Sequence, residues 1–590
     1  MTFMQSLSQE PTIFLTQKLW RFSDHRRHIV LYVALSIVAH LSFLLQPLIF
    51  GLVVTTIGKY GINRTSLPQI SFLLVLFPLQ ILLFWLLHGP SRVIERVVAF
   101  WAEIKYRRYL VDGVLDLGLS WHGEHDSGDT IDKVNKATEG LGQYSQNVFQ
   151  VIQVLVRVLG TTCVLMWFSF WLGLAVFALV IFSFIILFQF DKRLLPQYRA
   201  LNEFANKASA AVFDALSNVT TVKILDIEKP VLEGVIKRFK DSQKIYRANA
   251  QINEWKWFVG NMCFEMIKVV PLMVFLYFSI AYGGTIDAGT VTTLYLYLAD
   301  LAFAWFTFGS FYEQIMLYKN RVQNASTLES AFSARIQKTQ RVTGWRHLEL
   351  RDLNFTYNAG KERLHLDNVW LTLNQGERIA VIGESGSGKT TFLKVLHGMY
   401  PNAKAALQVD DGTPIATNFA DIDLKTMLVP QEPELFSSTI RENMTLGIDY
   451  DDASLMQAAH IAAFDQVVAE LPKGLESVIN EKGVNLSGGQ KQRLALARAI
   501  LFSTEKDVIL LDESTSSVDS ENETEIYQRI FNAFSNKTII ASIHKMNLLK
   551  FFDRIVMFKN GRIVDQGTFE ELLGKNEVFR KMWMQFIETA

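Results

Sequence analysis

The sequence predicts a chain of two parts, an all-α membrane domain with six helices and an α/β domain that follows it. Apolar stretches of about 20 residues, long enough to cross a hydrocarbon core about 30 Å thick, recur until about residue 320. From about residue 347, short β-rich runs alternate with helical ones, as in an α/β domain. We therefore expect a membrane domain over 1–330, a polar linker over 331–346 and a second domain over 347–590.

Composition excludes several classes of protein. The 58 basic and 58 acidic side chains balance, which argues against a nucleic-acid partner bound through bulk basicity. Hydrophobic residues make up 49% of the chain, too many for a mainly disordered protein. The two cysteines, Cys163 and Cys263, lie in apolar runs, so we expect no disulfide framework.

The six expected spans lie near 31–57, 69–88, 148–169, 171–190, 262–282 and 291–312. An even number of spans places both ends of the membrane domain on one side. Basic residues precede the first span and mark that side as cytoplasmic: Lys18, Arg21, Arg26 and Arg27. Nothing in the sequence resembles an organelle transit segment. We therefore expect an integral protein of the bacterial inner membrane, with its N-terminus and second domain in the cytoplasm.

The cytoplasmic connections between spans are long, and their sequences predict helices. About 60 residues separate the second span from the third, and about 70 separate the fourth from the fifth. At 1.5 Å per residue, helical extensions of about 25 residues reach roughly 35–40 Å beyond the bilayer. They turn back near 121–128 and 214–229, where they can contact a soluble domain. Ordinary cytoplasmic loops are the alternative.

Four charged residues fall within the expected spans, where an unpaired charge is costly. Glu265 and Lys268 lie three residues apart on one helix face and can form a structural pair. Arg157 and Asp300 have no partner nearby in the sequence, so we expect them to face a polar central cavity, with a cross-helix pair as the alternative. All four are candidate substrate-contacting residues.

The second domain contains a glycine-rich loop, GESGSGKT at 383–390, between a predicted strand and a predicted helix. Glycines let backbone N–H groups converge on phosphates at a helix N-terminus. Lys389 reaches the terminal phosphates, and the Thr390 hydroxyl is a ligand for Mg²⁺. The candidate nucleotide-binding residues here are Gly383, Ser385, Gly386, Ser387, Gly388, Lys389, Thr390 and Thr391.

A second apolar strand, over 507–511, ends in two acids. Asp512, at the strand tip, can hold Mg²⁺, and the carboxylate of Glu513 can polarise an attacking water. Acids after a strand are common, so this pattern by itself is weak evidence for a nucleotide site. It becomes strong evidence together with the phosphate loop about 120 residues earlier.

Between these two motifs lies LSGGQ at 486–490. By itself it reads as a helix start with Ser487 as the cap. In this order and spacing, the chain resembles the ATP-binding cassette (ABC) transporter family, whose signature is LSGGQ. Six spans with long arms followed by one cassette resemble an exporter half-transporter. The candidate ATP-contacting residues of the signature are Ser487, Gly488, Gly489 and Gln490.

The resemblance implies roles for four further residues. Tyr357 matches the aromatic residue that stacks on adenine, and Gln431 matches the glutamine that senses Mg²⁺ and the γ-phosphate. Asp519 matches the loop that crosses the dimer interface, and His544 matches the histidine that contacts the γ-phosphate. The segment 219–228 resembles a coupling segment of the membrane arms, and 121–129 does so more loosely.

The resemblance also implies a mechanism. Two cassettes close head to tail, and each ATP lies between the phosphate loop of one chain and the signature of the other. We therefore expect a dimer, most simply a homodimer, that uses ATP and Mg²⁺ to export an amphipathic small molecule, a peptide or a lipid. The alternative is an ATP-gated channel or a membrane sensor built on the same cassette.

Overall fold

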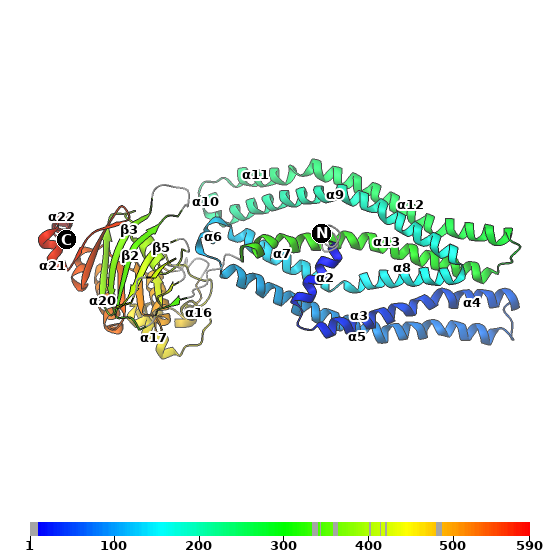
Figure 1. Ribbon diagram of the computed structural model, residues 1–590, viewed down its shortest axis with the longest axis horizontal. Coiled ribbons are helices and arrows are strands. Elements are labelled where there is room, and N and C mark those ends of the chain that lie inside the picture. The colour runs from blue at the N-terminus through cyan, green and yellow to red at the C-terminus, as the bar shows by residue number, and fades with distance from the viewer. Residues whose placement is uncertain are drawn as a thin grey trace. The chain divides into compact units, whose positions relative to one another are not determined.

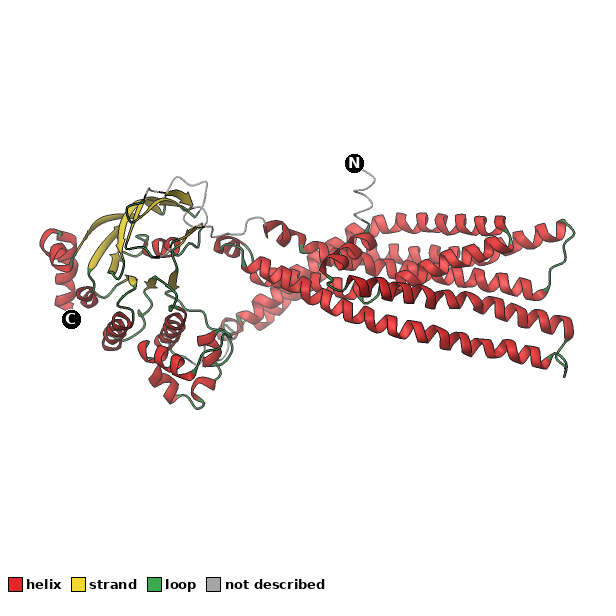
Figure 2. Cartoon of the chain, turned by 60° about the horizontal axis from the view of Figure 1, so that its bottom comes forward, coloured by secondary structure: helices red, strands yellow, loops and turns green. Residues whose placement is uncertain are grey.

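The computed structural model describes residues 10–332, 340–342, 344–357, 364–400, 403–412, 415–418, 422–479 and 486–589 (Figure 1). The chain forms two compact units, Met1–Leu115 with His125–Ser333 and Asp116–Glu124 with Ala334–Ala590. Residues 333–339 and 343 of the expected linker lie outside the described residues. In the described part of the chain, one unit is helical and the strands belong to the other (Figure 2).

The helical unit begins with α2, a short helix whose buried face includes Leu15 and Leu19. Within the described residues, six segments are long and apolar enough to cross a membrane: Arg26–Tyr60, Leu67–Leu115, Ser127–Phe168, Phe170–Ser217, Glu228–Ala281 and Ala288–Ala331. The expected six-span helical domain is confirmed. Its helices are α2 (Pro11–Phe22), α3 (Arg26–Leu41), α4 (Leu45–Tyr60), α5 (Leu67–Leu115), α7 (Ser127–Ser145), α8 (Val148–Phe168), α9 (Phe170–Ser217), α10 (Val219–Ile224), α11 (Glu228–Lys240), α12 (Gln243–Ala281), α13 (Ala288–Asn324) and α14 (Ser326–Ala331).

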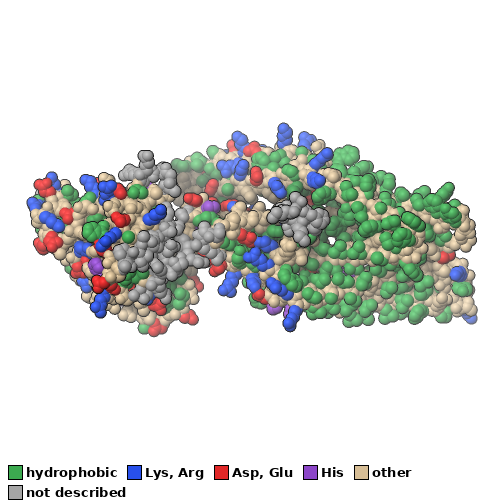
Figure 3. All heavy atoms as spheres, viewed as in Figure 1, with side chains coloured by type: hydrophobic (Ala, Val, Ile, Leu, Met, Phe, Trp, Pro, Cys, Tyr) green, Lys and Arg blue, Asp and Glu red, His purple; other side chains and the backbone are tan. Residues whose placement is uncertain are grey.

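The outer surface of these helices is apolar over much of their length. Large side chains such as Leu86, Trp171 and Tyr277 are well exposed, as lipid-facing side chains are. In Figure 3 hydrophobic side chains cover the part of the unit that carries α4 and the adjoining part of α5. A soluble protein does not expose an apolar surface of this size, so the unit belongs in a bilayer.

Three helices are much longer than a bilayer requires. α5, α9 and α12 have 49, 48 and 39 residues. A 48-residue helix is about 72 Å long, more than twice the thickness of the hydrocarbon core. The short helices α6 (Leu119–Glu124) and α10 (Val219–Ile224) lie at the two expected turns. The helical extensions predicted from the spacing are therefore present.

The second unit contains two principal sheets. The larger has the strand order β12-β11-β4-β10-β9-β8, in which all neighbouring strands are parallel except β11 and β12. The smaller is antiparallel, with the order β3-β2-β5-β6, and β1 and β7 form a separate parallel pair. The strands are β1 (Gln340–Arg341), β2 (His347–Phe355), β3 (Leu366–Asn374), β4 (Arg378–Gly383), β5 (Lys404–Val409), β6 (Ile415–Asn418), β7 (Ile422–Asp423), β8 (Thr426–Val429), β9 (Val508–Asp512), β10 (Thr538–Ser542), β11 (Arg554–Lys559) and β12 (Arg562–Gly567).

Hydrophobic cores cover both faces of the larger sheet. Every residue of β9 and β10 is buried, as expected for central parallel strands with apolar material on both faces. Phe392 of α15 packs into the core that also contains the smaller sheet, while α19 and α20 contribute to the other core. The helices are α15 (Lys389–Leu396), α16 (Ile440–Thr445), α17 (Asp452–Ile461), α18 (Asp465–Glu470), α19 (Gly488–Phe502), α20 (Ser520–Ala533), α21 (Phe569–Lys575) and α22 (Glu577–Thr589). The expected α/β domain is confirmed.

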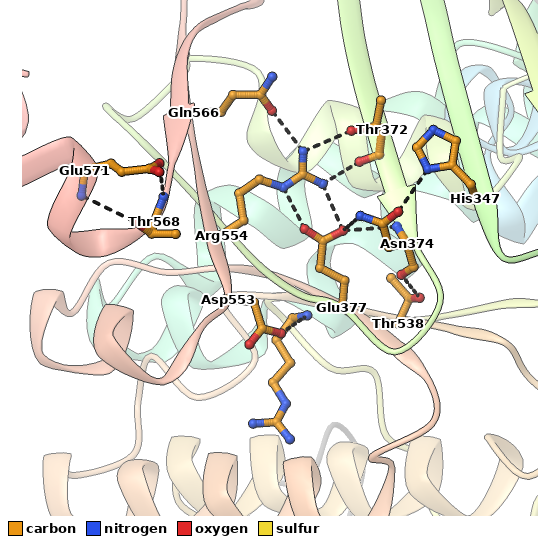
Figure 4. Close-up of polar contacts among 11 residues, drawn as sticks. His347, Thr372, Asn374, Glu377, Thr538, Asp553, Arg554, Gln566, Thr568 and Glu571 are labelled. Carbon is orange, nitrogen blue, oxygen red and sulfur yellow. Dashed lines mark hydrogen bonds and ion pairs between the residues drawn. The ribbon is translucent and has the colours of Figure 1, made fainter. Parts of the chain in front are cut away.

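The amino ends of β4 and β11 meet in a polar network around Arg554 (Figure 4). Its guanidinium forms two hydrogen bonds with the Glu377 carboxylate, Nε to Oε1 at 2.7 Å and a terminal nitrogen to Oε2 at 3.0 Å. It also donates to Thr372 of β3 and to Gln566 of β12. Both charged side chains are largely buried, at 16% and 13% exposure. This one side chain therefore links strands of both sheets.

We expect Arg554→Ala to destabilise the cassette by about 2 kcal/mol, because it leaves Glu377 without its ionic partner. The measurement is the thermal unfolding of the full chain, in which the cassette transition should fall by about 5 °C. Arg562→Ala is the matched control, since this arginine also pairs with a carboxylate but is 64% exposed. Equal midpoints for the two variants would contradict the structural role of Arg554.

Candidate functional site

Parallel strands bring the ends of β4, β8, β9 and β10 to one edge of the larger sheet. β4 ends at Gly383, and α15 begins at Lys389 after a tight loop. Gly386 and Gly388 have φ angles of +77° and +110°, which favour glycine. A Cβ atom on Gly383 would lie 2.3 Å from the Phe558 carbonyl oxygen. The glycines thus let the loop curl closely over the helix N-terminus, the geometry that binds phosphate.

A β-hairpin is hydrogen-bonded to this loop. Asn560 and Gly561 connect β11 to β12 and both have positive φ, as a type I′ turn requires. The Gly561 N–H donates to the Ser387 carbonyl at 2.8 Å, and its carbonyl accepts from the Asp367 N–H at 3.0 Å. Leu364, His365, Asn560 and Gly561 line the same cavity as the phosphate loop, and the sequence analysis missed all four. The Asn-Gly pair in the sequence predicts a hairpin, but it does not indicate that the hairpin contacts the phosphate loop.

Lys389 lies across the loop. Its Nζ donates to the carbonyl oxygens of Gly383 at 2.9 Å and Glu384 at 3.2 Å, and the residue is only 5% exposed. Burial lowers the pKa of Lys389, while the nearby carboxylates of Asp512 and Glu513 act in the opposite direction. The loop therefore holds one cation at the N-terminus of α15, an arrangement suited to a polyanion.

Thr390 and Asp512 place two oxygen atoms side by side. The Thr390 hydroxyl donates to Asp512 Oδ1 at 3.0 Å, and Asp512 is 1% exposed at the tip of β9. Burial raises the pKa of Asp512, and the hydrogen bond from Thr390 opposes this shift. Among the described residues, no cluster of three or more His, Cys, Asp or Glu side chains can hold a metal ion. A carboxylate and a hydroxyl nevertheless suit Mg²⁺, which usually completes its shell with phosphate oxygens and water.

Glu513 is held by residues from the ends of two other strands. Its Oε2 accepts from Gln431 Nε2 at 2.7 Å, and its Oε1 lies 2.5 Å from His544 Nε2. Its φ of +46° lies in the left-handed region, which is strained for a residue other than glycine and is often found at functional sites. With the phosphate loop, these three residues line one cavity of about 460 Å³.

Gln492 of α19 is a further residue that sequence reasoning missed. Its Nε2 donates to the Gln431 carbonyl at 3.2 Å and to Ser516 Oγ at 3.0 Å. Its Oε1 accepts from the Ser517 N–H at 2.8 Å, and the side chain is buried. Gln492 therefore connects the signature helix to the loops that carry Gln431 and Glu513.

The expected site residues fall into two groups. Those of the cavity wall are Ser385, Gly386, Ser387, Gly388, Lys389, Thr390, Thr391, Gln431, Glu513 and His544. Gly383 and Asp512 are not among the described lining residues, but they accept hydrogen bonds from Lys389 and Thr390 of the wall. Tyr357 lies at its border, where its hydroxyl is 3.0 Å from Thr391 Oγ1 and the residue is 44% exposed.

The signature belongs to the second group. Ser487 and Gln490 form a reciprocal capping box at the start of the 15-residue helix α19, and a Cβ on Gly489 would lie 2.8 Å from the Ser517 carbonyl oxygen. Asp519 caps α20, and its hydrogen bonds from Asn522 lower its pKa. Among the described residues that line the cavity, neither residues 487–490 nor Asp519 is found. One cassette therefore does not bring its own signature to its own phosphate loop.

The four charged residues of the expected spans are paired. Arg157 of α8 lies 3.1 Å from Asp300 Oδ1 of α13, which is the cross-helix pair considered as an alternative. Lys268 pairs with Glu265 at 2.8 Å within α12, as their spacing predicts. Contact of these residues with a substrate stays a prediction.

The cassette fold and its site define an ABC transporter. The family model described as ABC transporter transmembrane region matches residues 29–304, and the model described as ABC transporter matches residues 366–516. Together they cover more than half of the chain. The chain belongs to the ABC transporter family, and it is a membrane protein whose cassette is of the ATP-binding type.

Several relatives share most of this chain. ATP-binding cassette sub-family B member 6 of Mesocricetus auratus is 30% identical over 79% of the chain, which spans only 56% of that relative. The protein YknU of Bacillus subtilis, an uncharacterized ABC transporter ATP-binding protein, is 28% identical, with 81% of the chain and 82% of the relative covered. The mitochondrial iron-sulfur clusters transporter ATM1 of Saccharomyces cerevisiae is 26% identical, with 80% and 69% covered.

A solved structure shares the fold. The structure of a bacterial Atm1-family ABC exporter with ATP bound matches with a TM-score of 0.81 at 20% identity. The match covers 95% of this chain and 98% of that one. The expected architecture, a six-span membrane domain and one cassette in a single chain, is thus confirmed.

Proposed function

We propose that this chain is an ATP-driven exporter that works as a dimer of half-transporters, most simply a homodimer, by alternating access. The observation that carries the proposal is the division of the site. Lys389, Gln431, Glu513 and His544 line one cavity, whereas the signature at 487–490 is not among the described lining residues. A second cassette is needed to supply the missing wall, and closing two cassettes on ATP provides a motion that can drive the membrane helices.

The residues of the cavity have separate tasks in this proposal. Lys389 and the loop N–H groups hold the phosphates, while Thr390, Gln431 and Asp512 hold Mg²⁺, which neutralises charge on the phosphates when bound. Glu513 accepts a proton from the attacking water, and Gln431 and His544 orient the two oxygens of its carboxylate. Tyr357 stacks on adenine at the border of the cavity. Hydrolysis then opens the dimer and resets the membrane domain.

The N-terminus and the cassette lie on the cytoplasmic side of a bacterial membrane in this proposal. Lys18, Arg21, Arg26 and Arg27 precede the first span and favour a cytoplasmic N-terminus and cassette. Similarity to a Bacillus subtilis protein over 82% of its length is consistent with a bacterial plasma membrane, the inner membrane where a cell has two. The cargo is a small amphipathic molecule, a peptide or a lipid.

Export is tested in inside-out membrane vesicles supplied with ATP. The lumen of vesicles with the wild-type chain is compared by untargeted mass spectrometry with that of vesicles carrying Glu513→Gln. Export predicts compounds that accumulate only with the wild type. Vesicles that hydrolyse ATP yet accumulate nothing, and transfer no labelled lipid between leaflets, would contradict export.

The head-to-tail dimer predicts a specific cross-link. Cys163 and Cys263 are first replaced by Ser, and all chains carry Glu513→Gln so that bound ATP persists. One tagged chain then carries Ser385→Cys and the other Ser487→Cys. We expect ATP-dependent cross-linking of the two chains by a bismaleimide long enough to span a bound nucleotide, because each ATP lies between these residues and keeps the two thiols too far apart for a direct disulfide. Glu505→Cys, at an exposed position, replaces Ser487→Cys in the control. ATP binding without the cross-link would overturn this arrangement.

A further inference from the structure

Two neighbouring cavities in the helical unit lie where α9 and α13 leave the expected spans. The first, of about 430 Å³, is lined by residues of α9 and α13 that include Asp191, Tyr198, Asn202, Glu313 and Asn320. The second, of about 400 Å³, is lined by residues of α9, α12 and α13 that include Phe184, Phe188, Asp191, Lys256, Phe308 and Tyr312, together with Glu10. Asp191 lies in both walls, so the cavities adjoin. In Figure 1 α9 and α12 run side by side.

The charges of this region are arranged asymmetrically. Lys256 Nζ lies 2.8 Å from Asp191 Oδ1 and 3.9 Å from Glu313 Oε2, and its side chain is 3% exposed. The side chains of Asp191 and Glu313 are 20% and 32% exposed. The Tyr198 hydroxyl donates to Glu313 as well. Lys256 lines the second cavity with almost no exposed surface, whereas Asp191 lines both cavities and Glu313 lines the first. One lysine against two carboxylates leaves the triad with a net negative charge.

Other basic side chains do not reverse this charge. Lys192, Arg199 and Lys319 lie in the same region, but none of them lines either cavity. Lys319 and Arg199 interact electrostatically with each other, and Lys319 interacts with Glu10. The negative charge of the cavity walls therefore comes from Asp191 and Glu313, since Glu10 interacts with Lys319.

The rest of the lining suits an amphipathic cation. Five aromatic rings among the described lining residues come from α9 and α13, and an aromatic face attracts a cation as well as apolar groups. The ring of Phe188 already faces a cation, since Lys192 Nζ lies 5.0 Å from the centroid of this ring. Amide side chains of Asn202, Gln314 and Asn320 add hydrogen-bonding groups. An anion would meet two carboxylates that share one lysine, and a neutral apolar molecule would cover the exposed part of these carboxylates without adding a positive charge.

From this geometry we infer that the adjoining cavities at Asp191 and Glu313 form a binding site for amphipathic organic cations and admit the cargo from the cytoplasmic side. The inference deepens the proposed function and rests on it for transport, because export is what would make a bound cation a cargo. It restricts the cargo class to positively charged molecules with an apolar body.

Two probes of the same shape and opposite charge test the inference. Tetraphenylphosphonium and tetraphenylborate are bound at equilibrium to the full chain in nanodiscs without nucleotide, and binding to empty nanodiscs is subtracted. We expect the cation to bind at least about tenfold more tightly than the anion. Equal binding of the two probes, or tighter binding of the anion, would overturn the cation site.

Glu313→Gln is the diagnostic variant. The amide oxygen can still accept from Tyr198, and the pair of Asp191 with Lys256 remains, so the fold should be kept. We expect the affinity for tetraphenylphosphonium to fall about tenfold, while Glu313→Asp keeps most of it. Glu203→Gln, at an exposed position of α9 outside both cavities, is the control and should bind as the wild type does. An unchanged affinity of Glu313→Gln, in protein that hydrolyses ATP normally, would overturn the inference.

Transport of the same probe separates this inference from the proposed function. Cation binding with ATP-dependent accumulation in inside-out vesicles supports both. Binding without accumulation supports the site and overturns its role as a cargo site. Accumulation of other compounds by a chain that does not bind the cation leaves export standing and overturns the cation site.

Discussion

Glu513→Gln will lower ATP turnover by about 10² to 10³-fold, the usual contribution of a general base, while ATP binding persists. The amide can still accept a hydrogen bond from Gln431 or His544, so the cavity keeps its shape. What it loses is the ability to take a proton from water. The measurement is steady-state phosphate release by the purified chain, set beside equilibrium binding of labelled ATP.

Glu505→Gln is the matched control for this loss. It makes the same chemical change at an exposed position a few residues before β9, so it should hydrolyse ATP at the wild-type rate. Substantial residual turnover in Glu513→Gln would assign the proton transfer to another group.

Lys389→Ala will weaken ATP binding by about 100-fold, because a cation facing phosphate forms charge-assisted hydrogen bonds. Among the described residues that line the cavity, Lys389 is the only lysine or arginine. The free chain should stay folded, since the two carbonyl oxygens that Nζ contacts lie in a loop at the edge of an open cavity. Turnover falls with binding in this variant.

The weaker ATP binding of Lys389→Ala is measured as the dissociation constant of labelled ATP, and thermal unfolding checks that the variant is folded. Lys404→Ala removes an exposed lysine at the start of β5 and should bind ATP normally. If Lys389→Ala binds ATP as tightly as the wild type and fails only in turnover, the lysine acts on the transition state and not on binding.

Contiguous motifs were predictable because their geometry is local. The loop at 383–390 follows a strand and opens a helix, so its glycines, Lys389 and Thr390 have to gather at one helix end. Asp512 and Glu513 end a buried strand and therefore lie at the same edge of the sheet. Six apolar stretches likewise set the number of spans, because the bilayer fixes the length that each requires.

Contacts between distant segments were not predictable in the same way. Gly561 supports Ser387 although more than 170 residues separate them, and the Asn-Gly pair at 560–561 specifies only the turn. Gln492 follows the signature closely, yet only the packing of α19 shows that its amide holds the loop of Gln431.

By itself, the sequence determined the order of the domains, the six spans and their long extensions, and the residues of the phosphate loop. Each depends on chain-local rules: hydrophobic length, helical rise and the backbone freedom of glycine. Only the tertiary structure decided that Arg157 pairs with Asp300 and that Lys256 is buried between Asp191 and Glu313. A single charge near the end of a span has the same appearance in sequence whether it meets water, lipid headgroups or another helix. Packing alone selects its partner.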